Sequence, residues 1–204
     1  MAATRHPAEG KTHGQLGLSP GRVLLVEHSP AWQDMFEREK SDILAAIGHS
    51  VIQLEHVGST AIPGLMSKPV LDMLLGIAEL AAGPTLLEGL QPLGYRYLAK
   101  QVVQNHHVFG KGVALSHLLH IVEHDGPEWR RLLGFRHILL SRPEVARHYE
   151  ETKINLSRRH ASDRDAYALA KEPLIDRILI EHGMVDIVPH SASPGRSALH
   201  REGA

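Results

Sequence analysis

The feature that most constrains this chain is the segment from Pro69 to Leu75, which is apolar except for Asp72. A nearly continuous apolar run of this length is typical of a strand that is covered on both faces of a sheet. The fold is therefore expected to be built around a buried central strand. An ionised carboxylate in such a strand is costly unless a metal ion, a cation or hydrogen-bond donors compensate it. Asp72 is accordingly the first candidate for a functional residue.

The segments around this strand have strand-like patterns first and helical patterns later. A helix is predicted from Ser29, which precedes a proline, to Gly48, because apolar residues recur between them at helical spacing. Further strands are predicted at residues 51–57, 95–98, 102–109 and 118–122. From Pro127 to His182 the pattern is helical. This order predicts an α+β fold, with a mixed β-sheet flanked by helices and a helical C-terminal third.

The composition indicates one folded domain with flexible ends. Residues 1–20 and 188–204 are rich in Gly, Pro, His and polar residues and are predicted to be a disordered lead and tail. The predicted domain is therefore 21–187, which is a usual size for a single domain.

Charge and cysteine content narrow the class of protein. The net charge is −1, so no overall basic field indicates binding to nucleic acid. No apolar run is long enough to cross a membrane, and the N-terminus lacks the apolar core of a secretory signal. The absence of cysteine fits a reducing compartment. We therefore expect a cytoplasmic protein without membrane contact.

The turn before the central strand has the composition of a phosphate-binding turn. Gly58 allows a close backbone approach, and the amides and hydroxyls of Ser59 and Thr60 can face anionic oxygens. Lys68 can place an ammonium near the same anion. With Asp72 on the following strand, the segment predicts a site for phosphate and a divalent metal, with Mg²⁺ as the usual ion for phosphoryl chemistry. Lys68 and Asp72 are the candidate catalytic residues.

Three blocks of this sequence resemble the GrpB family, an uncharacterised group placed by resemblance in the nucleotidyltransferase superfamily. The central block is HVGSTAIPGLMSKPVLDMLLGI, and the block before it is VLLVEHSPAWQDMFEREKSDI. The later block is HLLHIVEHDGPEWRRLLGFRHILLSRPEVARHYEETKINL. The resemblance covers about residues 22–182 and implies a nucleotidyltransferase-like fold. In some bacteria the domain is fused to dephospho-coenzyme A kinase, so the resemblance also makes coenzyme A-like ligands relevant.

The superfamily pattern implies a Gly-Ser pair that holds nucleotide phosphates, followed by two acids, one residue apart, that hold a divalent metal. Gly58, Ser59 and Asp72 match this pattern by position. The second acid is expected at position 74, where the chain has leucine. Residues two apart on a strand share a face, so Leu74 removes the carboxylate that would share the metal.

Other residues are candidates to replace that acid. His56 precedes the turn, while His120 and Glu123 belong to the predicted strand at 118–122 and its end. With Asp72 they form the predicted metal-ligand set. The histidines favour a single transition metal as the alternative to Mg²⁺; the structural alternative is that they are hydrogen-bonded core or cleft residues.

Three cations in the helical third are candidates for phosphate binding. Arg136 matches the Phe-Arg position of the family, and Lys153 and Lys171 stand where the resemblance implies lysine. The alternative for each is an ordinary solvated helix charge.

Three functions follow from these observations. The first is transfer of a nucleotidyl or phosphoryl group from a nucleoside triphosphate, or another phosphorylated small molecule, to a small acceptor. The second is a non-catalytic module on an inactive transferase fold that binds a nucleotide or a coenzyme A-like anion, which Leu74 favours. The third is repurposed chemistry on a small carboxylate substrate, in which histidines replace the missing acid.

Overall fold

The structure is a computed structural model that describes residues 14–98 and 106–187. A five-stranded mixed sheet has the order β1-β2-β5-β4-β3. Its strands are β1 (Gln53–Val57), β2 (Leu71–Ile77), β3 (Tyr95–Tyr97), β4 (His107–Lys111) and β5 (His117–Glu123). β2 and β5 run parallel, whereas the pairs β1–β2, β4–β5 and β3–β4 are antiparallel. The predicted apolar strand is therefore central, as its composition requires.

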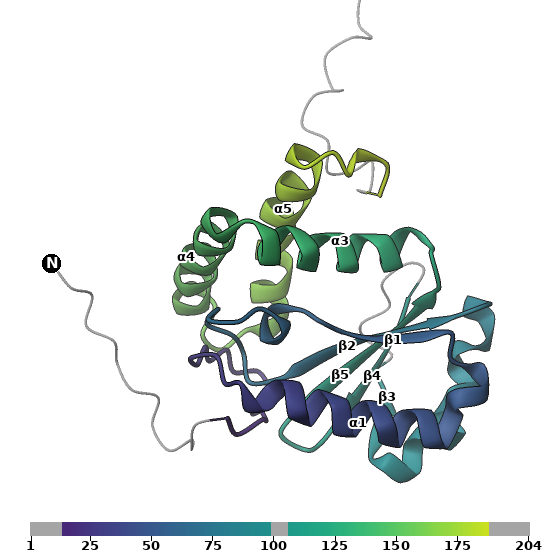
Figure 1. The fold of residues 1–204 in the computed structure, drawn as a ribbon. Helices are drawn as coiled ribbons and strands as arrows, with labels where there is room; N and C mark the ends of the chain where they lie inside the picture. Colours follow the sequence, from purple (N-terminus) through teal and green to yellow (C-terminus); the bar gives the residue numbers. More distant parts are fainter. Residues whose placement is uncertain (1–13, 99–105, 188–204) are drawn as a thin grey trace, which may run out of the picture.

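Helices cover the two faces of the sheet unequally (Figure 1). The α-helices are α1 (Ala31–Ile47), α2 (Leu87–Leu90), α3 (Pro127–Ser141), α4 (Pro143–Arg159) and α5 (Arg164–Glu181). Short 3-10 turns span Gly48–Ser50, Ser59–Ala61, Leu80–Leu86, Gln91–Leu93 and Val185–Ile187. α1 lies against one face, and the helices of the C-terminal third lie on the other side.

Strand alternation divides β2 between two cores. Met73 and Leu75 pack against Trp32 and Phe36 of α1. Side chains of the opposite parity point to the other face, where Leu74 packs with residues that include Trp129 of α3. The side chain of Asp72 belongs to this second face, beneath the C-terminal helices.

The predicted fold class is confirmed: a mixed sheet, flanking helices and a helical C-terminal third are all present. The central strand begins two residues later than predicted, at Leu71, and residues 99–105 of the predicted strand at 102–109 lie outside the described residues. The helix Arg164–Glu181 is capped at its N-terminus by Asp163, whose carboxylate accepts a hydrogen bond from the Ala166 amide. Within the part of the chain that the structure describes, no helix is long and apolar enough to cross a membrane.

The predicted start of the domain needs a correction. Leu18 is buried and pairs with Leu115, and the Gly14 carbonyl accepts a hydrogen bond from the Trp32 indole. Residues 14–20 therefore pack on the domain and do not belong to a disordered lead. The polar composition hid this because only a few apolar residues of the segment make the contact. Residues 1–13 and 188–204 lie outside the described residues.

Candidate phosphate-binding site

The predicted turn leaves β1 in a conformation that requires glycine. Gly58 has φ 70° and ψ −170°, and residues Ser59–Ala61 form a 3-10 turn directly after it. A Cβ atom at Gly58 would lie 2.5 Å from the Asp72 Oδ2 atom. The turn backbone and the Asp72 carboxylate are therefore in direct contact.

Gly58→Ala is expected to destabilise the protein by about 2–4 kcal/mol, because it combines a strained φ with a steric clash at Asp72. Gly64→Ala is a matched control, since Gly64 also has a positive φ, 78°, but nothing lies within 4 Å of the point that a Cβ atom would occupy there. Thermal unfolding of both variants separates backbone strain from the contact with Asp72. Equal losses of stability in the two variants would show that the contact is unimportant.

Lys153 of α4 is the buried cation of the site. Its side chain is 1% exposed, and its ammonium donates hydrogen bonds to Ser59 Oγ at 3.0 Å and to the Met66 carbonyl. An ammonium has three donors, so these bonds use two of them, and the Tyr149 ring lies 4.9 Å from the same ammonium. Burial, with the charge of Lys171 next, lowers the pKa of Lys153 to about 7. An anion bound here would favour the charged form.

A second residue of α4 holds the same loop. The Met66 amide donates a hydrogen bond to Glu150 Oε1 at 2.6 Å, while its carbonyl accepts from Lys153. Glu150 and Lys153 are three residues apart and so lie on one face of α4. This helix therefore fixes both the turn and the loop that follows it.

Two further lysines lie close to the Tyr167 ring. The ammonium of Lys68 is 5.6 Å from the centre of the Tyr167 ring, and that of Lys171 is 4.9 Å from it. Burial, with the charge of Lys171, lowers the pKa of Lys68 to about 8. Burial opposes the charge of Lys171 too, but the surrounding groups, Tyr149 and Tyr167 foremost, outweigh it and raise its pKa. Lys68, Lys153 and Lys171 are close enough that their charges lower one another's tendency to be protonated, and we call them the lysine trio. Lys153 is the member that contacts Ser59.

Asp72 carries a chain of two histidines on its other side. His120 Nε2 lies 3.4 Å from Asp72 Oδ1, and His120 Nδ1 lies 2.9 Å from His106 Nε2. Burial alone would raise the pKa of Asp72, but the hydrogen bond from His120 and the charges of His120, Lys68 and Lys171 outweigh it, and the pKa is lowered. Burial, with the charge of His120, lowers the pKa of His106 to about 3, so His106 is neutral at pH 7.

The predicted set of four metal ligands is not assembled. His56 has the opposite strand parity to Asp72 and stacks on Phe36 of α1, with its Nε2 bonded to Thr60 Oγ1 at 3.0 Å. Glu123 is exposed and pairs with Ile77, five positions along β2 from Asp72 and so roughly 16 Å away. Among the described residues no group of three His, Asp or Glu side chains is placed to hold a metal ion. Only Asp72 and His120 remain together, which corrects the prediction.

The position of the missing second acid is closed. Leu74 is fully buried and packs with Val57, Val122 and Trp129. The side chain of Trp129, from α3, covers this part of β2. Where the family pattern has an acid, this chain has a leucine that is packed in the core. The position is therefore not open to a metal ion.

Arg136, predicted to bind phosphate, is held against β1. Its Nη1 atom donates to Glu55 Oε2 at 2.8 Å and to the His56 carbonyl at 2.6 Å. These bonds join α3 to the strand that leads into the turn. Phosphate binding by Arg136 stays a prediction, whereas its contacts indicate a role in positioning.

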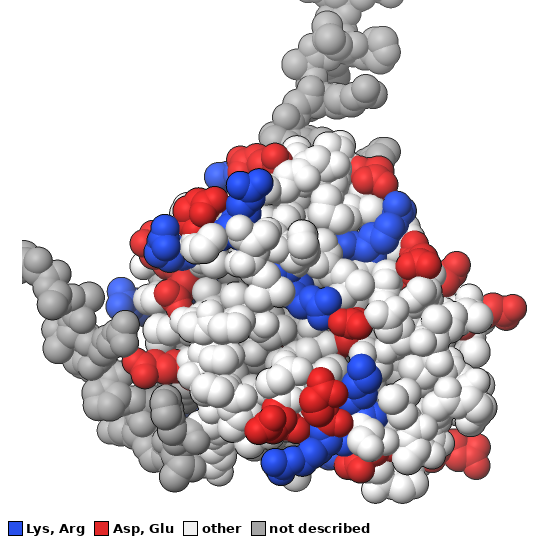
Figure 2. Space-filling view, in the orientation of Figure 1, with Lys and Arg blue, Asp and Glu red and all other residues white. Residues whose placement is uncertain are grey.

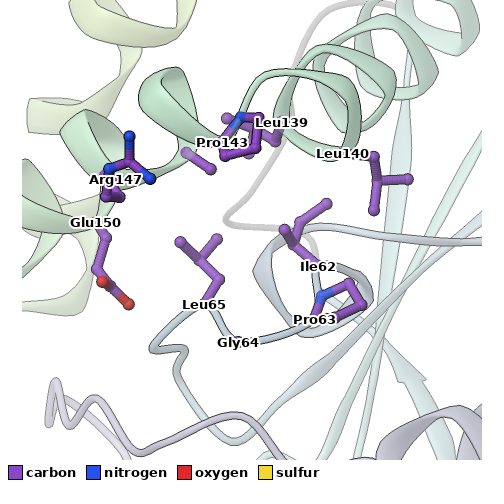
Figure 3. Close-up of a pocket in the computed structure, with 10 residues that line it drawn as sticks. Ile62, Pro63, Gly64, Leu65, Leu139, Leu140, Pro143, Arg147 and Glu150 are labelled. Carbon is purple, nitrogen blue, oxygen red and sulfur yellow. The ribbon is translucent and has the colours of Figure 1, made fainter.

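A hollow of about 330 Å³ lies beside the loop that follows the turn. Figure 3 shows Ile62, Pro63 and Leu65 facing the start of α4 and the end of α3, with Arg147 and Glu150 at one end. Because most of its lining is apolar, the hollow suits an uncharged group better than a phosphate. The surface in the view of Figure 2 carries basic and acidic residues interspersed, without one continuous basic patch.

The fold and site together define an α+β protein in which buried lysines and an Asp–His pair lie beside a glycine turn. The GrpB protein family model matches residues 22–181, and the chain belongs to this family. Glutamate-rich protein GrpB from Alkalihalophilus pseudofirmus is 36% identical in an alignment 172 residues long that covers 81% of this chain and 99% of that protein. A crystal structure of the conserved protein GrpB from Enterococcus faecalis matches with a TM-score of 0.69 and 28% identity, covering 78% of this chain and 99% of the other. A dephospho-CoA kinase from Mycolicibacterium paratuberculosis is 28% identical over 177 residues, but this chain spans only 44% of it.

Sequence reasoning missed His106, Glu150 and Tyr167. His106 lies next to a turn signal and was expected at the surface, and the pairing that places it beside His120 depends on the register of β4 on β5. Glu150 looked like an ordinary helix charge because its partner is a backbone amide far away in sequence. No local signal identifies such contacts.

Proposed function

We propose that this protein binds the phosphates of a nucleoside triphosphate at Gly58–Thr60 and transfers a nucleotidyl or phosphoryl group to a small acceptor. The observation that carries this proposal is Lys153, a buried ammonium bonded to the hydroxyl of Ser59 in the turn. Folding a lysine into the interior is costly, and binding an anion is the function that best offsets this cost. Lys68 and Lys171 extend the positive field over a ligand longer than one phosphate.

The residues would act mainly by positioning and electrostatics. The turn and the lysine trio would hold the phosphates and offset the negative charge that develops during transfer. Asp72 would supply one ligand to a Mg²⁺ ion, and the phosphates of the substrate would supply others. This arrangement is common, because proteins usually hold Mg²⁺ with one or two carboxylates together with substrate phosphates. Such an ion would neutralise phosphate charge when bound.

A non-catalytic module that binds a nucleotide or a coenzyme A-like anion is the second candidate. The buried Leu74 favours it, because a transfer site normally uses several carboxylates. The lysine trio serves this function as well, so binding alone does not separate the two candidates.

Thermal shift measurements with the four common nucleoside triphosphates, coenzyme A and inorganic tripolyphosphate, each with EDTA, Mg²⁺ or Mn²⁺, test the proposal. We expect at least one triphosphate to raise the melting temperature. When hydroxyl-bearing acceptors are then added, we expect phosphorus NMR to show the signal of a new phosphorylated product. Binding without any new product would favour the non-catalytic module. If none of the phosphate compounds stabilises the protein, both candidates fail.

Affinity for ATP in EDTA is expected to fall at least ~10-fold between pH 7 and pH 9. The pKa values of Lys153, about 7, and Lys68, about 8, place the loss of both charges in this range, where the charge of ATP changes little. An anion binds the protonated lysines better, so affinity is highest below pH 7 and decreases as they deprotonate. Calorimetric titrations at several pH values measure the effect, and an unchanged affinity would contradict it.

A further inference from the structure

We propose that Asp72 and His120 form half of a metal site, that phosphate oxygens of the bound ligand complete it, and that His106 orients His120. This inference rests on the proposed function, since the lysine trio must first hold a polyphosphate. It assigns the role of the absent second acid to a histidine on the neighbouring strand.

The two candidate ligand atoms have suitable spacing. His120 Nε2 and Asp72 Oδ1 are 3.4 Å apart, which is long for a hydrogen bond. One ion can nevertheless lie about 2.1 Å from both atoms, a usual metal–nitrogen or metal–oxygen distance. The side chains are 18% and 25% exposed, so both are reachable from solvent.

The sheet register explains why histidine can replace the missing acid. His120 on β5 is the direct partner of Leu74 on β2, so both side chains stand at one level of the same face. Leu74 is covered by Trp129, whereas His120 leans toward Asp72. A ligand atom is thus supplied from the strand beside the expected one.

The ligand must complete this site. No third His, Asp or Glu side chain joins the pair within the described ranges. The Asp72 carboxylate touches the turn at Gly58, and Lys153 of the lysine trio donates to Ser59 of the same turn. A polyphosphate held there would supply the remaining oxygens, as substrates do at many Mg²⁺ and Mn²⁺ sites.

His106 provides the support that metal-binding histidines usually need. With an ion at Nε2, the His120 proton must be on Nδ1, from which it would donate to His106 Nε2 at 2.9 Å. His106 Nδ1 is buried without a hydrogen-bond partner in the described part of the chain, and it would take the second proton. Each imidazole keeps one proton, so the shift of tautomer balances without proton release.

The donor types predict the ion. One imidazole and one carboxylate, with phosphate oxygens, favour Mn²⁺ or Zn²⁺ over Mg²⁺. We expect Mn²⁺ to bind at least ~10-fold more tightly than Mg²⁺ in the presence of tripolyphosphate.

Pulsed electron paramagnetic resonance of Mn²⁺ with the full chain and tripolyphosphate tests the inference. The nitrogen coupling of a coordinated imidazole is expected in the unmodified protein and should be lost in His120→Gln. Asp72→Asn should weaken Mn²⁺ binding at least ~10-fold, and His106→Leu by about 10–100-fold, with partial recovery in His106→Gln. His137→Gln, which removes an exposed histidine of α3, is the matched control and should change neither signal nor affinity.

The outcomes separate this inference from the proposed function. Tripolyphosphate binding in EDTA reports on the lysine trio alone and also shows that each variant is folded. If it persists in the unmodified protein while bound Mn²⁺ shows no nitrogen coupling, the metal half-site is overturned and the phosphate site stands. Nitrogen coupling that survives in His120→Gln, or Mn²⁺ binding that is equally tight without tripolyphosphate, also overturns the inference. If the unmodified protein does not bind tripolyphosphate, both this inference and the proposed function are overturned.

Discussion

Lys153→Met is expected to weaken the binding of tripolyphosphate about 10–100-fold while leaving the protein folded. A charge-assisted hydrogen bond contributes about 1.5–3 kcal/mol, and the variant removes both the charge and the donor that face the ligand. Methionine has a similar length and no desolvation cost, so stability should change little even though the bonds to Ser59 and Met66 are lost. Isothermal titration calorimetry and thermal unfolding measure the two effects independently.

Arg158→Met is the control for Lys153→Met, because it removes an exposed cation from the same helix. A similar loss of affinity in both variants would show that phosphate responds to general charge and not to the buried ammonium. Affinity of Lys153→Met within twofold of the unmodified protein would remove the observation on which the proposed function depends.

Leu74→Asp is expected to destabilise the protein by at least ~4 kcal/mol and not to restore a metal site. The side chain at this position is fully buried beneath Trp129, so the new carboxylate would be an unpaired charge in a packed core. For a chain of this size the melting temperature should fall by roughly 8–16 °C. Differential scanning calorimetry measures the change.

Leu74→Met is the matched control, because a swap of similar volume costs less than about 1.5 kcal/mol. If Leu74→Asp instead keeps its stability and binds Mn²⁺ more tightly with tripolyphosphate, then α3 can move away from β2. In that case Leu74 marks an open ligand position, and the packed state is only one of two arrangements.

The fold was predictable because its signals are local. The apolar run around Asp72 indicated a central strand, and proline and glycine marked the limits of α1. The boundaries moved by one or two residues because backbone pairing, and not apolar content, decides where a strand begins. Residues 14–20 were assigned wrongly because their order depends on contacts with segments distant in sequence.

The candidate site was predictable only in part, for the same reason. The turn and Asp72 are close in sequence, and the structure brings them into contact. His56 has the strand parity of the α1 face, and Glu123 lies at the far end of β5. Neither side chain is therefore near Asp72. The position of His106 depends on strand register, which local sequence signals did not specify at this strand.

Glu150 and Lys153 of α4 both form hydrogen bonds with the Met66 backbone, so the site can be completed only after α4 has been synthesised. The turn and Lys68 belong to the first half of the chain, but Lys153 and Lys171 come from helices that leave the ribosome after the whole sheet. A nascent chain that ends at β5 would therefore carry the turn without most of its cations. Capture of phosphate ligands by the growing chain would begin only when α4 and α5 have docked.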